Sequence, residues 1–153
     1  MPQLLEDPIE PIEQAIIEQL RSDLDPSDAA IEAFPDSVED WRRPRGSARI
    51  YVGFQRETLE PPPHQNFDTL KFQQGRTLDF LITISVKSLR REATGVYALM
   101  RKIRRSLAGF RPLPDRRALY QTTSGFSDYN AEGFWIYNMT FVINYPYVRA
   151  ADS

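Results

Sequence analysis

The feature that most restricts the fold of this chain is an alternating stretch near its middle, from position 78 to position 87. Apolar side chains fill every second position of it, namely Leu78, Phe80, Ile82, Ile84 and Val86. Successive side chains of a strand point to opposite faces of its sheet, so this spacing predicts a strand with a buried face. Such a face must be covered by a second layer of structure.

A second alternating stretch lies upstream, where Ile50, Val52 and Phe54 share one face. We expect the two stretches to pair as one long hairpin over residues 49–87. The connection between them, Glu57 to Gly75, exceeds the usual hairpin loop of about two to five residues, and connections of that length tend to be functional or mobile. It contains three successive prolines, which are incompatible with a central strand.

Two amphipathic helices are predicted, over residues 8–24 and 95–108. In both, apolar side chains recur every three or four positions, as on one helical face. These side chains are Ile9, Ile12, Ile16, Leu20 and Leu24 in the first helix, and Val96, Leu99, Met100, Ile103 and Leu107 in the second. Thr94 is the expected N-cap of the second helix and Gly109 its C-terminal cap. For Ala30 to Phe34, a short strand and irregular chain both stay open.

A further hairpin is predicted over residues 118–146, with its turn at Asp128 to Gly133 and an aromatic-rich second strand. The order of elements is then helix, strand, strand, helix, strand, strand. Paired strands separated by one helix favour an α+β fold, in which two helices pack on a mostly antiparallel sheet of four to five strands. The 153 residues fit one domain spanning positions 1–153.

Several classes of function lack the residues they need. The chain has no cysteine, which excludes disulfides, thiol nucleophiles and cysteine metal sites. His64, the single histidine, has no recognisable catalytic partner, and no calcium, zinc or phosphate-loop motif occurs. We expect no catalytic residue, no cofactor and no metal. We also expect an intracellular protein without a membrane segment, since no run reaches the ~18 apolar residues of a span.

Charge is divided unevenly along the chain. Residues 1–40 hold twelve acidic residues and one basic residue, whereas residues 87–117 hold ten basic and two acidic ones. The candidate contact residues are Glu10, Glu13 and Glu18 in the acidic region, and Arg90, Arg91, Arg101, Lys102, Arg104 and Arg105 in the basic region. An acidic and a basic patch on one molecule can meet head to tail between identical copies, and such contacts make rings when they close.

The basic cluster has three interpretations: a solvated helix face, a protein interface, or a surface that binds nucleic-acid phosphates. A pI near 5.5 is not typical of a nucleic-acid-binding protein, so direct nucleic-acid binding is not expected. In the last strand, Trp135 and Tyr137 point away from Phe134 and Ile136. One member of each pair therefore needs cover from a helix, a loop or another subunit.

Four segments carry a resemblance to a known family. They read Leu-Arg-Arg at 89–91, Tyr-Ala-Leu-Met-Arg-Lys-Ile-Arg at 97–104, Leu-Ala-Gly-Phe-Arg-Pro at 107–112 and Trp-Ile-Tyr-Asn-Met-Thr-Phe at 135–141. With the order of elements and the chain length, they resemble the tail terminator, or tail-completion, proteins of tailed bacteriophages, most closely the Mu-like contractile-tail branch. The resemblance implies a hexameric ring that caps the tail tube, ends its polymerisation and docks the neck proteins, without catalytic residues.

The resemblance also implies partners and a place in the virion. The partners are further copies of the chain, the tail tube protein, the neck or connector proteins and, as an additional candidate, the sheath. The acidic region of one subunit would meet the basic region of its neighbour, and the 57–75 arm, with His64 and Phe67, would reach the tube. The protein would be assembled in the host cytoplasm and lie at the head-proximal end of the tail. A neck or head-completion adaptor and a nucleic-acid-binding protein are the alternatives.

Overall fold

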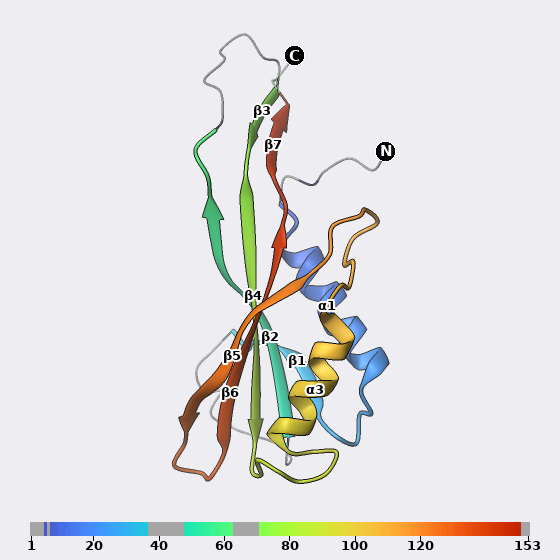
Figure 1. Ribbon diagram of the computed structural model, residues 1–153, viewed down its shortest axis with the longest axis vertical. Coiled ribbons are helices and arrows are strands. Elements are labelled where there is room, and N and C mark those ends of the chain that lie inside the picture. Colours follow the sequence, from blue (N-terminus) through green and yellow to red (C-terminus); the bar gives the residue numbers. More distant parts are fainter. Residues whose placement is uncertain (1–4, 6, 37–47, 63–70, 151–153) are drawn as a thin grey trace.

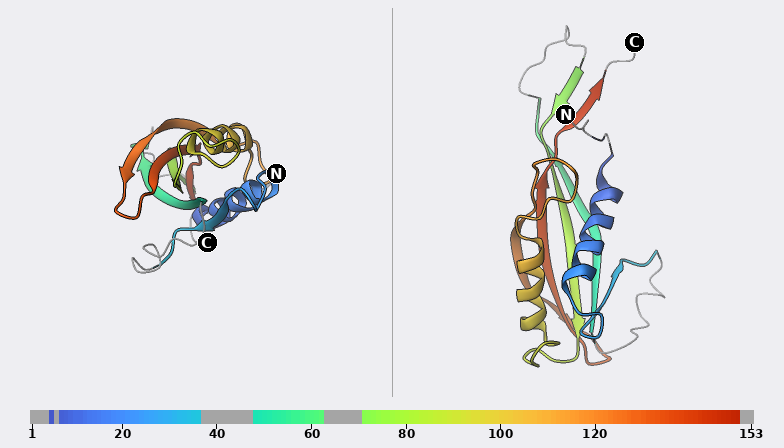
Figure 2. Two further views of the ribbon diagram at one scale, coloured as in Figure 1. Left: turned by 90° about the horizontal axis from the view of Figure 1, so that it is seen from below. Right: turned by 90° about the vertical axis from the view of Figure 1, so that its right-hand side faces the viewer.

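The computed structural model describes residues 5, 7–36, 48–62 and 71–150. The elements follow in the order α1 (Ile9–Asp23), β1 (Ala30–Ala33), β2 (Ala48–Leu59), β3 (Lys71–Gln74), β4 (Arg76–Val86), α3 (Val96–Leu107), β5 (Tyr120–Tyr129), β6 (Trp135–Asn144) and β7 (Tyr147–Ala150). The strands form a five-stranded sheet of order β1-β2-β4-β6-β5 and a two-stranded sheet of β3 and β7. Both helices lie side by side on one face of the larger sheet, which confirms the predicted α+β class (Figure 1, Figure 2).

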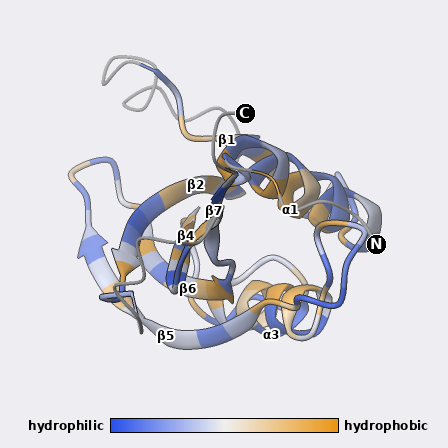
Figure 3. Cartoon of the chain, turned by 90° about the horizontal axis from the view of Figure 1, so that it is seen from above, coloured by the Kyte–Doolittle hydropathy of each residue, from blue (hydrophilic) through white to orange (hydrophobic). Residues whose placement is uncertain are grey.

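Both predicted hairpins are present in the larger sheet. Strands β2 and β4 pair antiparallel from Ala48 opposite Val86 to Leu59 opposite Arg76. Strand β6 pairs antiparallel with β4 on one side and with β5 on the other. The sheet curves around the helices, as the view along the long axis shows (Figure 3).

The core lies between the curved sheet and the two helices. The alternating side chains that predicted β4, from Leu78 to Val86, are all buried there. Ile12, Ile16 and Leu20 of α1, together with the apolar stripe of α3, cover them. Full burial of one such aliphatic side chain contributes roughly 1.5–3 kcal/mol, so this layer supplies the main driving force for the fold.

The connection between β2 and β4 is more ordered at its ends than predicted, and the assignment of Glu57 to Gly75 to a loop was wrong there. Strand β2 runs on to Leu59, and residues Lys71–Gln74 form β3. Strand β3 pairs with β7, which the sequence did not reveal, and the two strands extend as an arm beyond the core (Figure 1). Of the open alternatives for Ala30 to Phe34, the short strand is correct for Ala30–Ala33, which pairs parallel with β2.

Helix α3 begins without the predicted side-chain cap. Gly95, not Thr94, is its N-cap residue, and no side chain caps it. Instead, the N–H groups of Val96 and Tyr97 donate to the carbonyl oxygens of Ser88 and Leu89 at 3.0 and 3.1 Å. The loop before the helix therefore satisfies the donors that an N-cap side chain would have satisfied. Gly109, predicted as the C-terminal cap, has a φ of +80°, as expected for that role.

Candidate subunit-contact surfaces

The acidic helix α1 and the basic helix α3 lie next to each other (Figure 2). Some of their charged side chains form ion pairs and hydrogen bonds within the chain. The Nζ of Lys102 lies 3.0 Å from Oδ2 of Asp28 and also donates to the carbonyl oxygen of Ala93 at 3.0 Å. The hydroxyl of Ser106 donates to Oδ2 of Asp23 at 2.7 Å. Lys102, a predicted contact residue, thus joins α3 to the loop that follows α1.

The other predicted bases are exposed on α3 and on the loop before it. The Nε of Arg104 donates to Oε1 of Gln121 on β5 at 2.7 Å, so this side chain lies over the edge of the sheet. The guanidinium of Arg90 lies 5.8 Å from the ring centre of Tyr97. Arg91, Arg101 and Arg105 are exposed to solvent. The structure therefore places a cationic surface along the outer side of α3.

The three predicted acids of α1 do not share one environment. Glu10 and Glu18 are exposed, whereas Glu13 is half-buried against β2. Burial raises the pKa of Glu13, and a hydrogen bond from the backbone N–H of Phe54 acts in the opposite direction. Glu13 therefore belongs to the contact between α1 and the sheet, while Glu10 and Glu18 are available to a partner.

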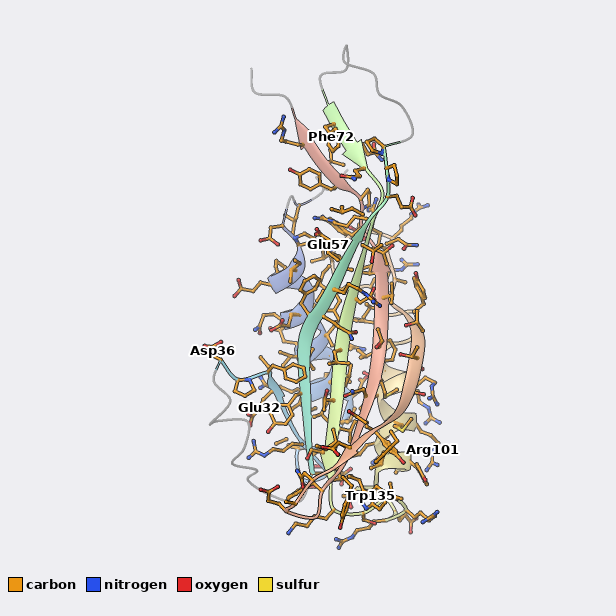
Figure 4. The ribbon with its side chains drawn as sticks, turned by 90° about the vertical axis from the view of Figure 1, so that its left-hand side faces the viewer. Glu32, Asp36, Glu57, Phe72, Arg101 and Trp135 are labelled. Atoms are coloured by element: carbon orange, nitrogen blue, oxygen red, sulfur yellow. The ribbon has the colours of Figure 1, made fainter. Side chains whose placement is uncertain are left out.

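The described part of the arm carries an exposed aromatic side chain, Phe72. Strands β3 and β7 pair from Lys71 opposite Ala150 to Gln74 opposite Tyr147. The rings of Phe72 and Tyr147 meet edge to face at 6.2 Å, and Phe72 lies close to the outer end of the described arm (Figure 4). His64 and Phe67, the contact residues predicted for this region, lie outside the described residues.

A buried arginine fixes the base of the arm to the body. The Nε of Arg76 donates to the carbonyl oxygen of Tyr145 at 2.9 Å, and the backbone N–H of Tyr145 donates to the carbonyl oxygen of Arg76 at 2.9 Å. The guanidinium lies over the rings of Tyr145 and Tyr147 and 3.5 Å from Oε2 of Glu57. This junction holds β7 in line with β4.

The sequence reasoning missed both Arg76 and the second arm strand. Strand β7 has four residues and follows Pro146, so it offers no measurable alternation of its own. Arg76 is the first residue of β4 and lies two positions before the alternating stretch that predicted this strand. A cation just before an apolar strand is a usable signal for a buried, paired charge, because such a charge must find partners when the strand is buried.

The described residues contain no group of three or more His, Cys, Asp or Glu side chains able to hold a metal ion. No helix in the described part of the chain is long and apolar enough to span a bilayer. The features that stand out are exposed charge, exposed aromatic side chains and a projecting arm. These features suit contacts with other macromolecules.

Two solved structures share the fold over most of the chain. A chain from a structure described as the virion of a native gene transfer agent particle has 15% sequence identity and a TM-score of 0.56, with 88% of this chain and 93% of that chain covered. A chain from a structure of the PVC sheath/tube terminator of an extracellular contractile injection system, in its extended state, has 13% identity and a TM-score of 0.56. That match covers 98% of this chain but 61% of the other.

These matches confirm the predicted resemblance to tail terminators at the level of the fold. Among curated proteins no sequence matches the chain. A family model, in contrast, matches residues 16–153, which include the second half of α1, the whole of α3 and both sheets. Because this match spans nearly the whole chain, the protein is a member of the Gp37 protein family.

Proposed function

We propose that the protein is the terminator of a phage-type tail, forming a ring that caps the tail tube and ends its polymerisation. The observation that carries the proposal is the fold that 98% of the chain shares with a sheath/tube terminator. The gene transfer agent match, which covers 93% of its own chain, supports a role within a virion particle. The protein would lie in the virion, at the head-proximal end of the tail.

The shape of the subunit supports a role in which two ends have different partners. The helices and the five-stranded sheet form the body, and the β3–β7 arm extends from one end of it (Figure 1). Phe72, 42% exposed, offers an apolar contact on the arm. We assign the arm to the tube, with the sheath as a further candidate. Termination is then steric, because the opposite end carries no copy of the arm and instead receives the neck proteins.

The ring is assigned to contacts between copies of the chain, with six subunits as the expected number. Exposed acids on α1 and exposed bases on α3 give each subunit two charged surfaces of opposite sign. Complementary charge orients partners and excludes like-charged contacts more than it adds affinity. The proposal gives the chain no catalytic step, cofactor or metal. The protein acts by binding alone.

The test is a tube-growth experiment. Tube protein is polymerised with increasing, substoichiometric amounts of the full-length protein, and tube lengths are measured by electron microscopy. We expect shorter tubes that carry gold-labelled protein at one end only. The variant Phe72→Ser should lengthen the tubes again, whereas Tyr120→Ser, an equally exposed aromatic on the body, should cap like the wild type.

Other outcomes would lead to other functions. If tube lengths stay unchanged and the protein binds isolated neck proteins, its function would be that of a neck adaptor and not of a terminator. Salt-sensitive binding to DNA, lost on neutralising Arg104 and Arg105, with no effect on tubes, would replace it by a nucleic-acid-binding protein.

A further inference from the structure

Five aromatic side chains from three elements form one continuous cluster at the end of the body opposite the arm. We name it the aromatic patch; its members are Tyr97, Phe126, Tyr129, Trp135 and Tyr137. The ring centres of Tyr129 and Trp135 lie 4.7 Å apart. Phe126 lies 6.0 Å from Trp135 and 5.7 Å from Tyr137, and Tyr97 lies 6.3 Å from Tyr137.

The patch is exposed because helix α3 does not reach the last strand of the sheet. The β5–β6 register sets Phe126 opposite Tyr137 and Tyr129 opposite Trp135, so all four rings share the face that the helices cover. Helix α3 contacts β4 and β6, whereas β5 is the edge strand. Phe126 is 58% exposed, Tyr129 53% and Tyr97 40%.

The exposed aromatic side chains of the patch form one contiguous group and are not scattered singly over the surface. The described residues contain seven exposed large hydrophobic side chains, and three of them are in the patch. Single exposed aromatic residues need no explanation, but a contiguous apolar patch with a polar rim marks an interaction surface. Trp135 and Tyr137 are half-buried, pack against the core and form the floor of the patch.

The rim of the patch is positively charged on the side of α3, whereas the β5–β6 hairpin carries the exposed acids Asp128 and Glu132. Arg90 lies over Tyr97, and Arg104 reaches Gln121 on β5. Arg101 lies at the same lower end of the body as Trp135 (Figure 4). Partial burial and a hydrogen bond with Tyr97 raise the pKa of Tyr137, a floor residue that is neutral at physiological pH with or without this shift. Aromatic side chains next to arginines are the composition of binding hot spots, and the arginine side of the rim selects an acidic partner.

An acidic surface of the required sign lies on the opposite flank of the same molecule. Helix α1 lies over β1 and β2, at the edge of the sheet farthest from β5. Its exposed acids on this side, and those of the segments that follow it, are Glu10, Glu18, Glu32 and Asp36. Asp23 and Asp25, in contrast, lie beside Lys102 and Arg105 of α3. Figure 4 shows Glu32 and Asp36 at one lateral edge of the sheet and Arg101 at the other. Two bases of this flank already have partners within the chain. Arg21 donates to the carbonyl oxygen of Ile31 at 2.7 Å, and Arg49 pairs with Glu32 at 3.0 Å.

We infer that the aromatic patch is the centre of a head-to-tail contact that receives the acidic α1–β1 flank of a second copy of this chain. The inference rests on the proposed ring and assigns the surfaces that build it. Two complementary surfaces on opposite flanks cannot both be buried in the single interface of a two-fold dimer. They produce a heterologous contact, which generates a closed ring or an open filament.

The first test compares two variants of exposed aromatic residues on the same strand. Phe126→Ser/Tyr129→Ser removes the outer rings of the patch. Tyr120→Ser removes a ring from the other face of β5, where Tyr120 pairs with Val142 and is 44% exposed. Molecular mass is measured by light scattering over a concentration series, with and without tube protein. We expect roughly a tenfold or greater loss of self-association for each patch ring and none for Tyr120→Ser.

The second test uses complementary defects. Glu18→Lys/Asp36→Lys damages the acidic flank and leaves the patch intact, so this variant should also be monomeric. Mixed with Phe126→Ser/Tyr129→Ser, it should form a two-chain complex, because one intact patch then meets one intact acidic flank. A patch that paired with another patch would give no complex in this mixture and would overturn the head-to-tail assignment.

The outcomes separate this inference from the proposed function. If the wild type caps tubes as a ring and the patch variant forms the same ring, the inference is overturned but the terminator function is not. A patch variant that forms the ring but no longer binds tube protein assigns the patch to the tube and overturns the inference as well. A wild type that neither self-associates nor shortens tubes overturns the proposed function itself.

Discussion

At the scale of single residues, Arg76 shows how one buried charge connects two parts of the molecule. Its side chain is 4% exposed, and it contacts Tyr145, Tyr147 and Glu57, which come from the body, the arm and β2. A buried cation stabilises a fold only when its partners are well placed, and removing it leaves those partners without their donor. Arg76 therefore sets the position of the arm as well as stability.

We predict that Arg76→Met lowers the free energy of unfolding by about 2 kcal/mol, since a buried charged hydrogen bond is lost and Glu57, 34% exposed, recovers part of its solvation. Amides of β7 should also exchange with deuterium faster, because the arm loses its attachment. Urea unfolding and hydrogen exchange measure the two effects. Arg111→Met, at an exposed position, is the matched control and should change neither. Unchanged exchange in β7 would contradict the role of Arg76 at the junction.

Glu13 predicts a dependence of stability on pH. Its pKa is raised in the folded protein, so ionisation costs more there than in the unfolded chain. Its contribution to stability is fully present below the ordinary pKa of 4.5 and is lost as pH rises through the raised value. Glu13→Gln keeps an oxygen that can accept from Phe54 and has no proton to lose.

We therefore expect Glu13→Gln to be more stable than the wild type at pH 7, with the difference shrinking towards pH 4, where Glu13 becomes neutral. Urea unfolding at several pH values measures it. The exposed Glu18→Gln provides the comparison and should show no such trend. A difference that stays constant over this range would mean that Glu13 is not the group responsible.

At the scale of elements, the start of α3 depends on close backbone contact and not on a capping side chain. A Cβ added to Gly95 would lie 2.6 Å from the backbone nitrogen of Arg91 and 2.8 Å from the carbonyl oxygen of Leu89. Since backbone atoms cannot rotate away, Gly95→Ala must displace the loop that supplies the hydrogen bonds to the first turn of the helix.

We predict that Gly95→Ala lowers the free energy of unfolding by about 1–3 kcal/mol, the usual cost of overpacking. Gly125→Ala on β5 is the control, because nothing lies within 4 Å of its added Cβ and its φ is not positive. Thermal unfolding of the two variants gives the comparison. Equal, small shifts would indicate that the loop of residues 88–95 adapts freely.

The sequence predicted those elements in which one apolar face places apolar residues at a regular spacing. Helices α1 and α3 each bury one face and expose the other, so their apolar residues repeat at a spacing of three to four. Strand β4 is buried on both faces, but only the face turned to the helices is uniformly apolar, so its apolar residues repeat at a spacing of two. Strands β1, β3 and β7 have four residues each, too few for a period, and each is held by pairing with a distant segment. Pairing partners cannot be found from local spacing alone.

The candidate contact residues also divide into those visible in the local sequence and those that depend on distant partners. The sequence located the charged helices, because charge is visible in composition, but it could not show that Lys102 is bound by Asp28 or that Glu13 faces β2. It also predicted that either Trp135 and Tyr137 or their neighbours Phe134 and Ile136 need cover, without deciding between the two sets. Phe126 and Tyr129, the exposed neighbours of Trp135 and Tyr137, became apparent only from the β5–β6 register.

At the scale of the whole molecule, two oppositely charged flanks predict that self-association weakens as salt rises. The screening length is about 10 Å at 0.1 M salt and about 3 Å at 1 M, so exposed charges on two surfaces lose most of their attraction over this range. The aromatic patch is not screened by salt, and it should retain part of the affinity at high salt. Light scattering at a series of salt concentrations measures the slope.

Arg101→Gln should reduce that slope, because Arg101 lies on the flank that receives the acids, while Arg111→Gln, in the loop beyond α3, should leave it unchanged. The single variant Phe126→Ser, which keeps the ring of Tyr129, should lower the affinity at every salt concentration and leave the slope as it is. The two variants thus separate orientation by charge from affinity by apolar burial. If the wild type self-associates equally strongly at both ends of the salt series, charge does not contribute to ring assembly. The aromatic patch would then be its main determinant.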